Sequence, residues 1–133
     1  MTRPTRRRLI GVLLAVAAVA VGLAVHVAAP DGAVSDIAGD ALYVIAVWGG
    51  VVALAPRWPS IVAGGTMLVW CVGVELFQLT GLPVRWAAEW PPVMLALGSV
   101  FDPRDLVVYA VTAALLTTAD AALRRAVRAP ADR

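Results

Sequence analysis

The sequence predicts an all-α protein, a four-helix transmembrane bundle with an interfacial or re-entrant segment between the third and fourth helices. Of its 133 residues, 61% are apolar and only 15% are charged, whereas a soluble domain is about 45–50% apolar and about 25% charged. Four stretches approach the roughly 20 apolar residues that a helix needs to cross the hydrocarbon core. They fill the chain, so we expect one transmembrane domain, residues 9–123, and no separate soluble domain.

The first predicted helix, residues 9–29, follows a basic cytoplasmic N-terminus, residues 1–8. The helix carries no charge over 21 residues, which exceeds the roughly 7–15 apolar residues of a signal-peptide core. Cleavage after Ala29 would also place Pro30 at the new N-terminus, where peptidases tolerate proline poorly. We therefore expect this segment to be retained as a membrane helix.

The second and third helices are predicted over residues 37–55 and 61–79. Ser35 or Asp36 is expected to cap the second helix by accepting its free N–H groups, and Pro56 ends it. Small residues let membrane helices approach closely. Glycines that we expect to serve this purpose are Gly49, Gly50, Gly64, Gly65 and Gly73.

The segment between the third and fourth helices, residues 82–104, does not resemble a simple loop. It mixes charged residues with tryptophans, and Pro91-Pro92 interrupts any helix. The apolar stretch that follows, residues 93–101, has nine residues, too few to cross about 30 Å of hydrocarbon. We expect this segment to lie in the membrane interface or to enter the membrane partway.

The arginines predict the orientation of the chain. The fourth helix is predicted over residues 105–123, before a basic cytoplasmic tail, residues 124–133. With four crossings, both chain ends and the 56–60 link share one side, which receives nine of the eleven arginines. Cytoplasmic loops are enriched in basic residues, and the absence of lysine is typical of a high-GC bacterial genome. We expect a multi-pass protein of the bacterial cytoplasmic (plasma) membrane, with both termini cytoplasmic.

Polar side chains from all four predicted helices lie at a similar depth. Because a helix rises about 1.5 Å per residue, each predicted helix places a polar side chain in the outer third of the membrane. Charged groups in hydrocarbon are costly unless they face the bundle interior or water. We expect them to converge in an acidic, outward-facing pocket, with Arg85 and Arg104 as counter-ions. The candidate ligand-binding residues are Asp40, Tyr43, Glu75, Gln78, Arg85, Asp102, Asp105 and Tyr109.

Several polar residues also have simpler interpretations. Asp40 can interact favourably with a helix dipole at the membrane boundary, and His26 alone is typical of a packed or snorkelling residue. Asp120 is expected to be a solvated partner of Arg124, four residues later. Glu75 lies deepest and cannot cap the N-terminus of its helix, so it is the strongest candidate for a functional or essential structural role.

Motifs for catalysis, metal binding or cofactor binding are absent from the sequence. It contains no HExxH or CxxC spacing, no GxSxG and no glycine-rich phosphate loop. We therefore expect no catalytic residues, no metal and no cofactor. The arginines lie at helix ends rather than on a separate basic face, so nucleic-acid binding is not expected.

Four segments carry a family resemblance. They are Gly39-Asp40-Ala41-Leu42-Tyr43, Glu75-Leu76-Phe77-Gln78-Leu79, Leu97-Gly98-Ser99-Val100-Phe101-Asp102, and Asp105 with Tyr109. Their order and spacing resemble a small bacterial family of four-helix membrane proteins, the domain of unknown function 2809, and more distantly the VanZ-like proteins. The resemblance implies the four-helix topology. It does not suggest an activity, because the family has none assigned. It also points to Asp40, Glu75, Gln78, Asp102, Asp105 and Tyr109.

We expect a non-enzymatic cell-envelope protein whose outer pocket binds a lipid headgroup, an envelope precursor or a partner protein. Two alternatives stay open: a transporter component that moves protons or cations through buried carboxylates, and a membrane enzyme acting on a lipid-linked substrate. A chain of carboxylates that passes protons or cations across the membrane needs members at several depths. Here the carboxylates lie at a single depth, which favours a binding site over a transporter. The surrounding partner is the lipid bilayer, and the sequence leaves homo-oligomer formation open.

Overall fold

The computed structural model describes residues 2–127, and this range contains helices and no strand. The helices are α1 (Arg3–Ala28), α2 (Ala33–Leu54), α3 (Ser60–Gln78), α4 (Leu82–Glu89), α5 (Val93–Leu97) and α6 (Pro103–Ala126). Four of them, α1, α2, α3 and α6, are long and apolar enough to cross a membrane. The structure therefore confirms the all-α class and its four transmembrane helices.

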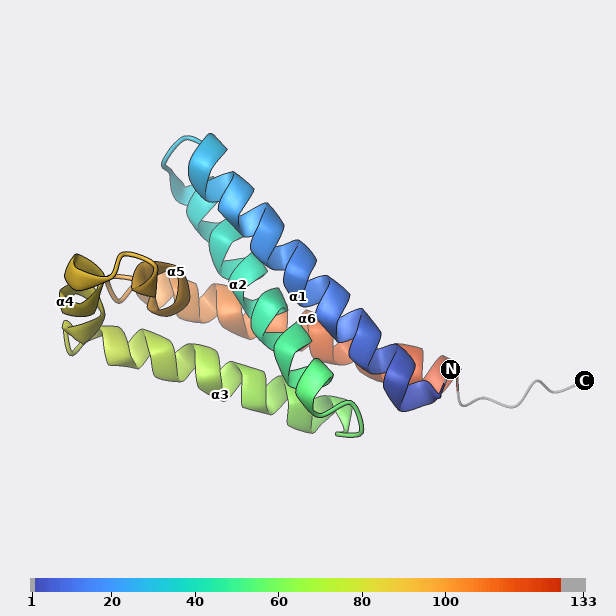
Figure 1. Cartoon of the computed structure of the whole chain (residues 1–133). Helices are drawn as coiled ribbons and strands as arrows, with labels where there is room; N and C mark the ends of the chain where they lie inside the picture. The colour runs from blue at the N-terminus through green and yellow to red at the C-terminus, as the bar shows by residue number, and fades with distance from the viewer. Residues whose placement is uncertain (1, 128–133) are drawn as a thin grey trace, which may run out of the picture.

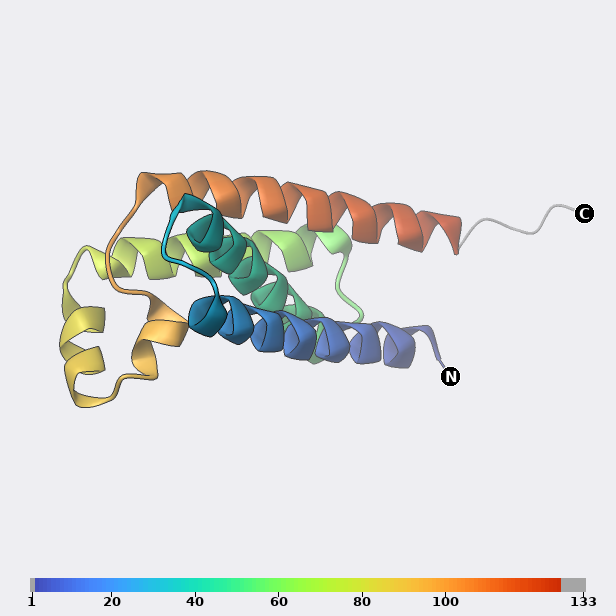
Figure 2. The ribbon, with the colours of Figure 1, turned by 90° about the horizontal axis from the view of Figure 1, so that it is seen from above.

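Helix α2 lies at the centre of the bundle. It contacts α1, α3 and α6, whereas α1 packs against α2 alone among the described helices. Figure 1 shows the α1–α2 hairpin inclined to the α3–α6 pair, so that the two pairs separate toward the end that holds α4. The beginning of α1 and the end of α6 lie at one end of the bundle, and α4 and α5 lie at the opposite end (Figure 2).

The start of α2 differs from the prediction. The helix begins at Ala33 after Gly32, before the expected residue 37, so Ser35 and Asp36 lie within its first turns and do not cap it. The Ser35 hydroxyl instead donates to the Gly32 carbonyl at 2.7 Å. The expected cap is therefore wrong, because a capping side chain must precede the helix to reach its free N–H groups.

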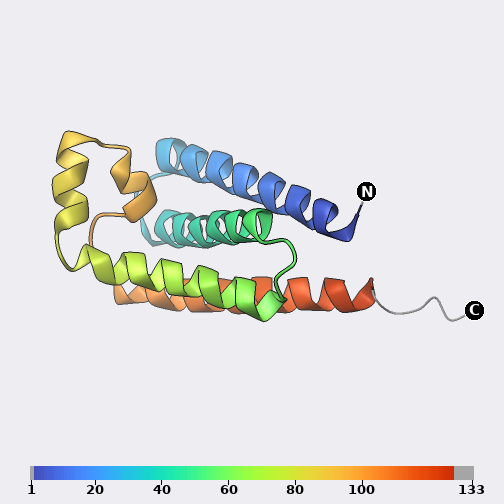
Figure 3. The same cartoon turned by 60° about the horizontal axis from the view of Figure 1, so that its bottom comes forward.

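Two short helices, α4 and α5, occupy the segment between α3 and α6. Both pack against α3, and Figure 3 shows α4 at the end of the long helices and α5 turned back toward them. The chain enters α4 through Gly81 and leaves α5 through Gly98, whose φ angles are 69° and 63°. Glycine adopts this left-handed conformation without a steric penalty, which allows both sharp turns.

The core fills the space between α2, α3 and α6. Its buried residues are Val44, Trp48, Val52, Ala63, Met67, Cys71, Tyr109 and Ala113. Many large apolar side chains on the long helices remain exposed, for example Val16, Leu54, Val69 and Leu115. Such an apolar outer surface is expected where lipid replaces water.

Small residues bring α1 and α2 into close contact. A Cβ at Gly49 would lie 2.5 Å from the carbonyl oxygen of Gly11 and 3.0 Å from the Cβ of Ala15. A Cβ at Gly64 would collide with the side chain of Thr117 on α6. Close packing is therefore confirmed at Gly49 and Gly64. The expectation is wrong at three further glycines, where a Cβ would meet nothing within 4 Å: Gly50, Gly65 and Gly73.

Candidate functional site

Most of the predicted site residues gather at the end of the bundle that holds α4 and α5. They come from the first half of α2, the last turns of α3 and the beginning of α6. We use the name acidic cluster for the carboxylates gathered there: Asp36, Asp40, Glu75, Asp102 and Asp105. Packing of α2, α3 and α6 around one core brings side chains from these three helices to the same end.

Glu75 is the most deeply buried member of the acidic cluster, with 0% of its surface exposed. Its Oε1 accepts the backbone N–H of Asp102 at 2.6 Å, and its Oε2 accepts the Tyr109 hydroxyl at 3.3 Å. A buried carboxylate is costly unless hydrogen bonds satisfy its oxygens. Both oxygens are satisfied here, and the two bonds join the end of α3 to the start of α6.

Asp40 and Asp105 form a carboxyl pair between α2 and α6. The two carboxyl groups interact electrostatically, and a hydrogen bond between them would require one of the two to carry a proton. Without that proton, Asp40 Oδ2 and Asp105 Oδ1 are buried with no hydrogen-bond donor among the described residues. The pair therefore has unused capacity to accept hydrogen bonds.

Arg104 supplies the positive charge within the acidic cluster. Its Nη2 lies 3.4 Å from Asp36 Oδ2 and 3.4 Å from Asp102 Oδ2. Its Nε lies 3.7 Å from Asp105 Oδ1. The Arg104 side chain is 39% exposed and that of Asp36 is 53% exposed, so these residues form the open rim of the cluster, whereas Glu75 lies at its base.

Arg85 does not take part in the acidic cluster. It is exposed on α4, and none of the hydrogen bonds or ion pairs among residues 2–127 involves its side chain. The expectation that Arg85 is a counter-ion is wrong, because α4 contacts α3 and α5 and neither α2 nor α6. His26 is likewise exposed on α1, apart from the cluster.

Tyr43 connects α2 to the short helices. Its hydroxyl donates to the Ala96 carbonyl at 2.9 Å and accepts the indole N–H of Trp70 at 3.0 Å. The last carbonyls of a helix have no partner within it, so Tyr43 caps the end of α5. The contribution of Trp70 was not predicted, because a tryptophan in an apolar helix gives no sequence signal for this bond.

Gln78, on α3, also bonds to the end of α5. Its Nε2 donates to the Leu97 carbonyl at 3.0 Å, while its Oε1 is buried without a donor among the described residues. A Cβ at Gly98 would collide with the Gln78 side chain. The amide and the glycine therefore fit together, and they fix the chain between α5 and α6 beside the acidic cluster.

An apolar groove of about 520 Å³ is lined by residues of α3 together with Trp86 of α4 and Leu97 of α5. Trp70 and Leu97 line this groove and also contact Tyr43 and Gln78. The Phe77 and Trp86 rings pack at its wall, with centroids 5.5 Å apart. An apolar groove thus lies next to the polar end of the bundle.

A second polar network lies at the opposite end, around Arg7. Its Nη1 donates to the carbonyls of Pro56 and Trp58 at 2.9 and 2.6 Å. Its Nη2 donates to Asp120 Oδ2 at 2.7 Å. Asp120 is only 8% exposed, so the expectation of a solvated Asp120 is wrong. Sequence analysis missed the pair because the two residues are 113 positions apart.

The chemistry available to the acidic cluster is that of a hydrogen-bond acceptor with excess negative charge. Five carboxyl groups face one guanidinium. Among residues 2–127, no group of three or more His, Cys, Asp or Glu side chains is arranged to hold a metal ion. The geometry suits a ligand that carries positive charge and several N–H donors.

The comparisons with known proteins identify one family model. A model described as "Protein of unknown function (DUF2809)" matches residues 29–113. The matched range includes the whole acidic cluster, Tyr43, Gln78 and the first half of α6. No curated protein and no solved structure matches the chain significantly.

Proposed function

Because the chain belongs to the DUF2809 family, whose description states no activity, we propose its function from the geometry of its acidic cluster. The protein is a small, non-enzymatic membrane protein of the bacterial cell envelope. Its acidic cluster binds a lipid or lipid-linked envelope precursor through a primary ammonium group. The termini face the cytoplasm, and the cluster faces outward.

The Asp40–Asp105 pair is the observation that carries this proposal. Each of these half-buried residues, on different helices, has one buried carboxyl oxygen without a hydrogen-bond donor among the described residues, Asp40 Oδ2 and Asp105 Oδ1. Arg104 Nε lies 3.7 Å from Asp105 Oδ1, beyond hydrogen-bond distance. Leaving buried polar atoms unpaired costs about 1–3 kcal/mol each. An ammonium group would supply three N–H donors and a positive charge, and hydrogen bonds between ionised groups are the stronger ones.

The neighbouring apolar groove supports a lipid rather than a free amine. It lies beside the polar end of the bundle, and its lining side chains are apolar or aromatic. An acyl chain placed there would lie below a headgroup at the level of Arg104 and Asp36. The exposed rim of the cluster gives the headgroup access from the water–membrane boundary.

The transporter alternative has one observation in its favour, since the Asp40–Asp105 pair can hold a proton. A path through the bundle would continue toward Asp120 at the other end. The core between them consists of Val44, Trp48, Val52, Met67, Cys71 and other largely apolar residues. A charged species crossing it would have no polar partner, so binding at one end is the better-supported function.

Lipid retention measured by native mass spectrometry tests the proposal. The full chain is purified in a neutral detergent and titrated with phosphatidylethanolamine or phosphatidylcholine, whose headgroups differ in N–H donors. We expect preferential retention of phosphatidylethanolamine, lost in Asp40→Asn. Asp31→Asn is the matched control, because Asp31 is exposed before α2 and outside the cluster. Equal retention of both lipids by the wild-type chain would contradict the proposal.

A further inference from the structure

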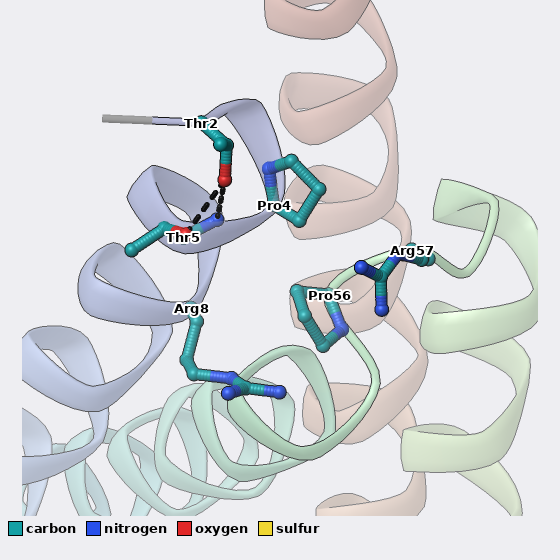
Figure 4. A pocket seen from close by; sticks show the side chains of 6 residues that line it. All are labelled: Thr2, Pro4, Thr5, Arg8, Pro56 and Arg57. Atoms are coloured by element: carbon teal, nitrogen blue, oxygen red, sulfur yellow. Dashed lines mark hydrogen bonds between the residues drawn. The ribbon is translucent and has the colours of Figure 1, made fainter.

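A second cavity opens at the end of the bundle that holds the termini. It has a volume of about 120 Å³ and lies between the start of α1 and the loop that follows α2 (Figure 4). Its lining residues are Thr2, Pro4, Thr5, Arg8, Pro56 and Arg57. The cavity thus combines two arginines and two hydroxyl groups from two separate parts of the chain.

Arg8 and Arg57 provide the charge of the cavity. The Nε of Arg8 donates to the Ala53 carbonyl at 3.0 Å, which orients the guanidinium and leaves its terminal nitrogens available. The Arg57 side chain donates no hydrogen bond to any residue between 2 and 127. Guanidinium groups bind phosphate oxygens through paired N–H donors, so two such groups at one cavity favour a phosphate.

The threonine hydroxyls add neutral donors. Thr2 Oγ1 lies 2.7 Å from Thr5 Oγ1 and accepts the Thr5 backbone N–H at 3.4 Å. Only one hydroxyl proton is used in the contact between the two side chains, so the other remains available to a ligand. Figure 4 shows both hydroxyls on the α1 side of the cavity, above Arg8.

The described residues around the cavity bring no free negative charge to it. Among residues 2–127, the acidic side chain at this end, Asp120, is held by Arg7 at 2.7 Å, and none of the lining residues is acidic. Arg8 immediately precedes Leu9, the first residue of the apolar stretch, and Arg57 precedes the exposed Trp58. Tryptophan is enriched at the level of the lipid headgroups, so the cavity lies at the depth of the phosphates.

We propose that this cavity binds the phosphate of an anionic phospholipid in the leaflet that the termini face. Basic pockets between transmembrane helices recognise anionic headgroups through this combination of charge and depth. Inorganic phosphate offers the same chemistry without an acyl chain. The proposal is independent of the acidic cluster, which lies at the other end of the bundle.

The test uses the full chain in neutral detergent, titrated with phosphatidylglycerol and followed by native mass spectrometry. The double variant Arg8→Gln/Arg57→Gln is compared with Arg6→Gln/Arg125→Gln, which removes the same charge from the same end without changing the cavity lining. We expect the first variant to weaken binding about tenfold or more, because charge-assisted bonds are lost. The second should retain wild-type affinity within about twofold.

Two results would overturn the proposal. Equal weakening by both double variants would show that the lipid adsorbs to the arginines in general. Displacement of phosphatidylglycerol from the wild-type chain by millimolar inorganic phosphate would show a site for the free ion instead of a lipid. Arg57→Gln alone repeats the test if the double variant does not fold, because Arg57 is exposed in a loop and its side chain bonds to none of residues 2–127.

Discussion

The Arg7 network offers a quantitative test of how the helices are held together. Among the helices of residues 2–127, α1 packs against α2 alone. Arg7 nevertheless connects α1 to α6 through Asp120 at 2.7 Å and to the α2–α3 loop through carbonyls at 2.9 and 2.6 Å. Arg7→Met removes all three bonds and leaves Asp120 buried without this counter-ion. Removing one partner of a buried ion pair costs about 3–5 kcal/mol, so we expect Arg7→Met to lower the free energy of unfolding by this amount.

Asp120→Asn should cost less, about 1–3 kcal/mol, because Arg7 keeps its two carbonyl partners. The double variant Arg7→Met/Asp120→Asn no longer contains a buried, unpaired carboxylate. We therefore expect it to be less destabilised than the sum of the single variants, with a coupling energy of about 1–3 kcal/mol.

The assay is reversible unfolding in mixed micelles, followed by the fluorescence of the five tryptophans. Arg125→Gln, an exposed residue at the same end, is the control and should change the unfolding free energy by less than about 0.5 kcal/mol. Additive effects of the two single substitutions would refute the reasoning, because they would show that Arg7 and Asp120 stabilise the bundle independently.

Four other predictions concern packing, the site and topology. Gly49→Leu should destabilise the chain by about 1–3 kcal/mol or more in the same micelle unfolding assay, since a Cβ there meets the Gly11 carbonyl oxygen at 2.5 Å. Gly50→Ala should be neutral or slightly stabilising. Gly98→Ala should cost about 1–2 kcal/mol because φ is 63°, and normal stability would contradict this. Glu75→Gln should cost about 1–3 kcal/mol, because the bonds to the Asp102 N–H and the Tyr109 hydroxyl lose the carboxylate charge. If the amide oxygen stays on the Asp102 N–H, the Tyr109 hydroxyl proton also loses its acceptor; an unchanged unfolding free energy would argue against a buried structural role. Reporter fusions should place both termini in the cytoplasm, and a periplasmic signal from either would reverse the proposed orientation.

The four transmembrane helices and the depth at which the acids gather could be predicted from the order of residues alone. Hydropathy and helix length are local properties, and hydrocarbon constrains them strongly. The helical rise then places Asp40, Glu75 and Asp105 near one end of the bundle, where the structure shows Glu75 and Asp105 close to Asp102 and Arg104. The cost of exposing charge to lipid makes this convergence predictable without coordinates.

Only the tertiary structure decided which side chains become partners. The placement of whole helices decides three results that the sequence did not predict. Helix α1 packs on one face of α2, Arg85 lies outside the acidic cluster, and Trp70 bonds to Tyr43. The pairing of Arg7 with Asp120 joins the two ends of the chain. Helical periodicity specifies which residues share a face, but it does not specify which other helix that face meets. Side-chain packing among α1, α2, α3 and α6 decides that, and it involves contacts between residues far apart in the sequence.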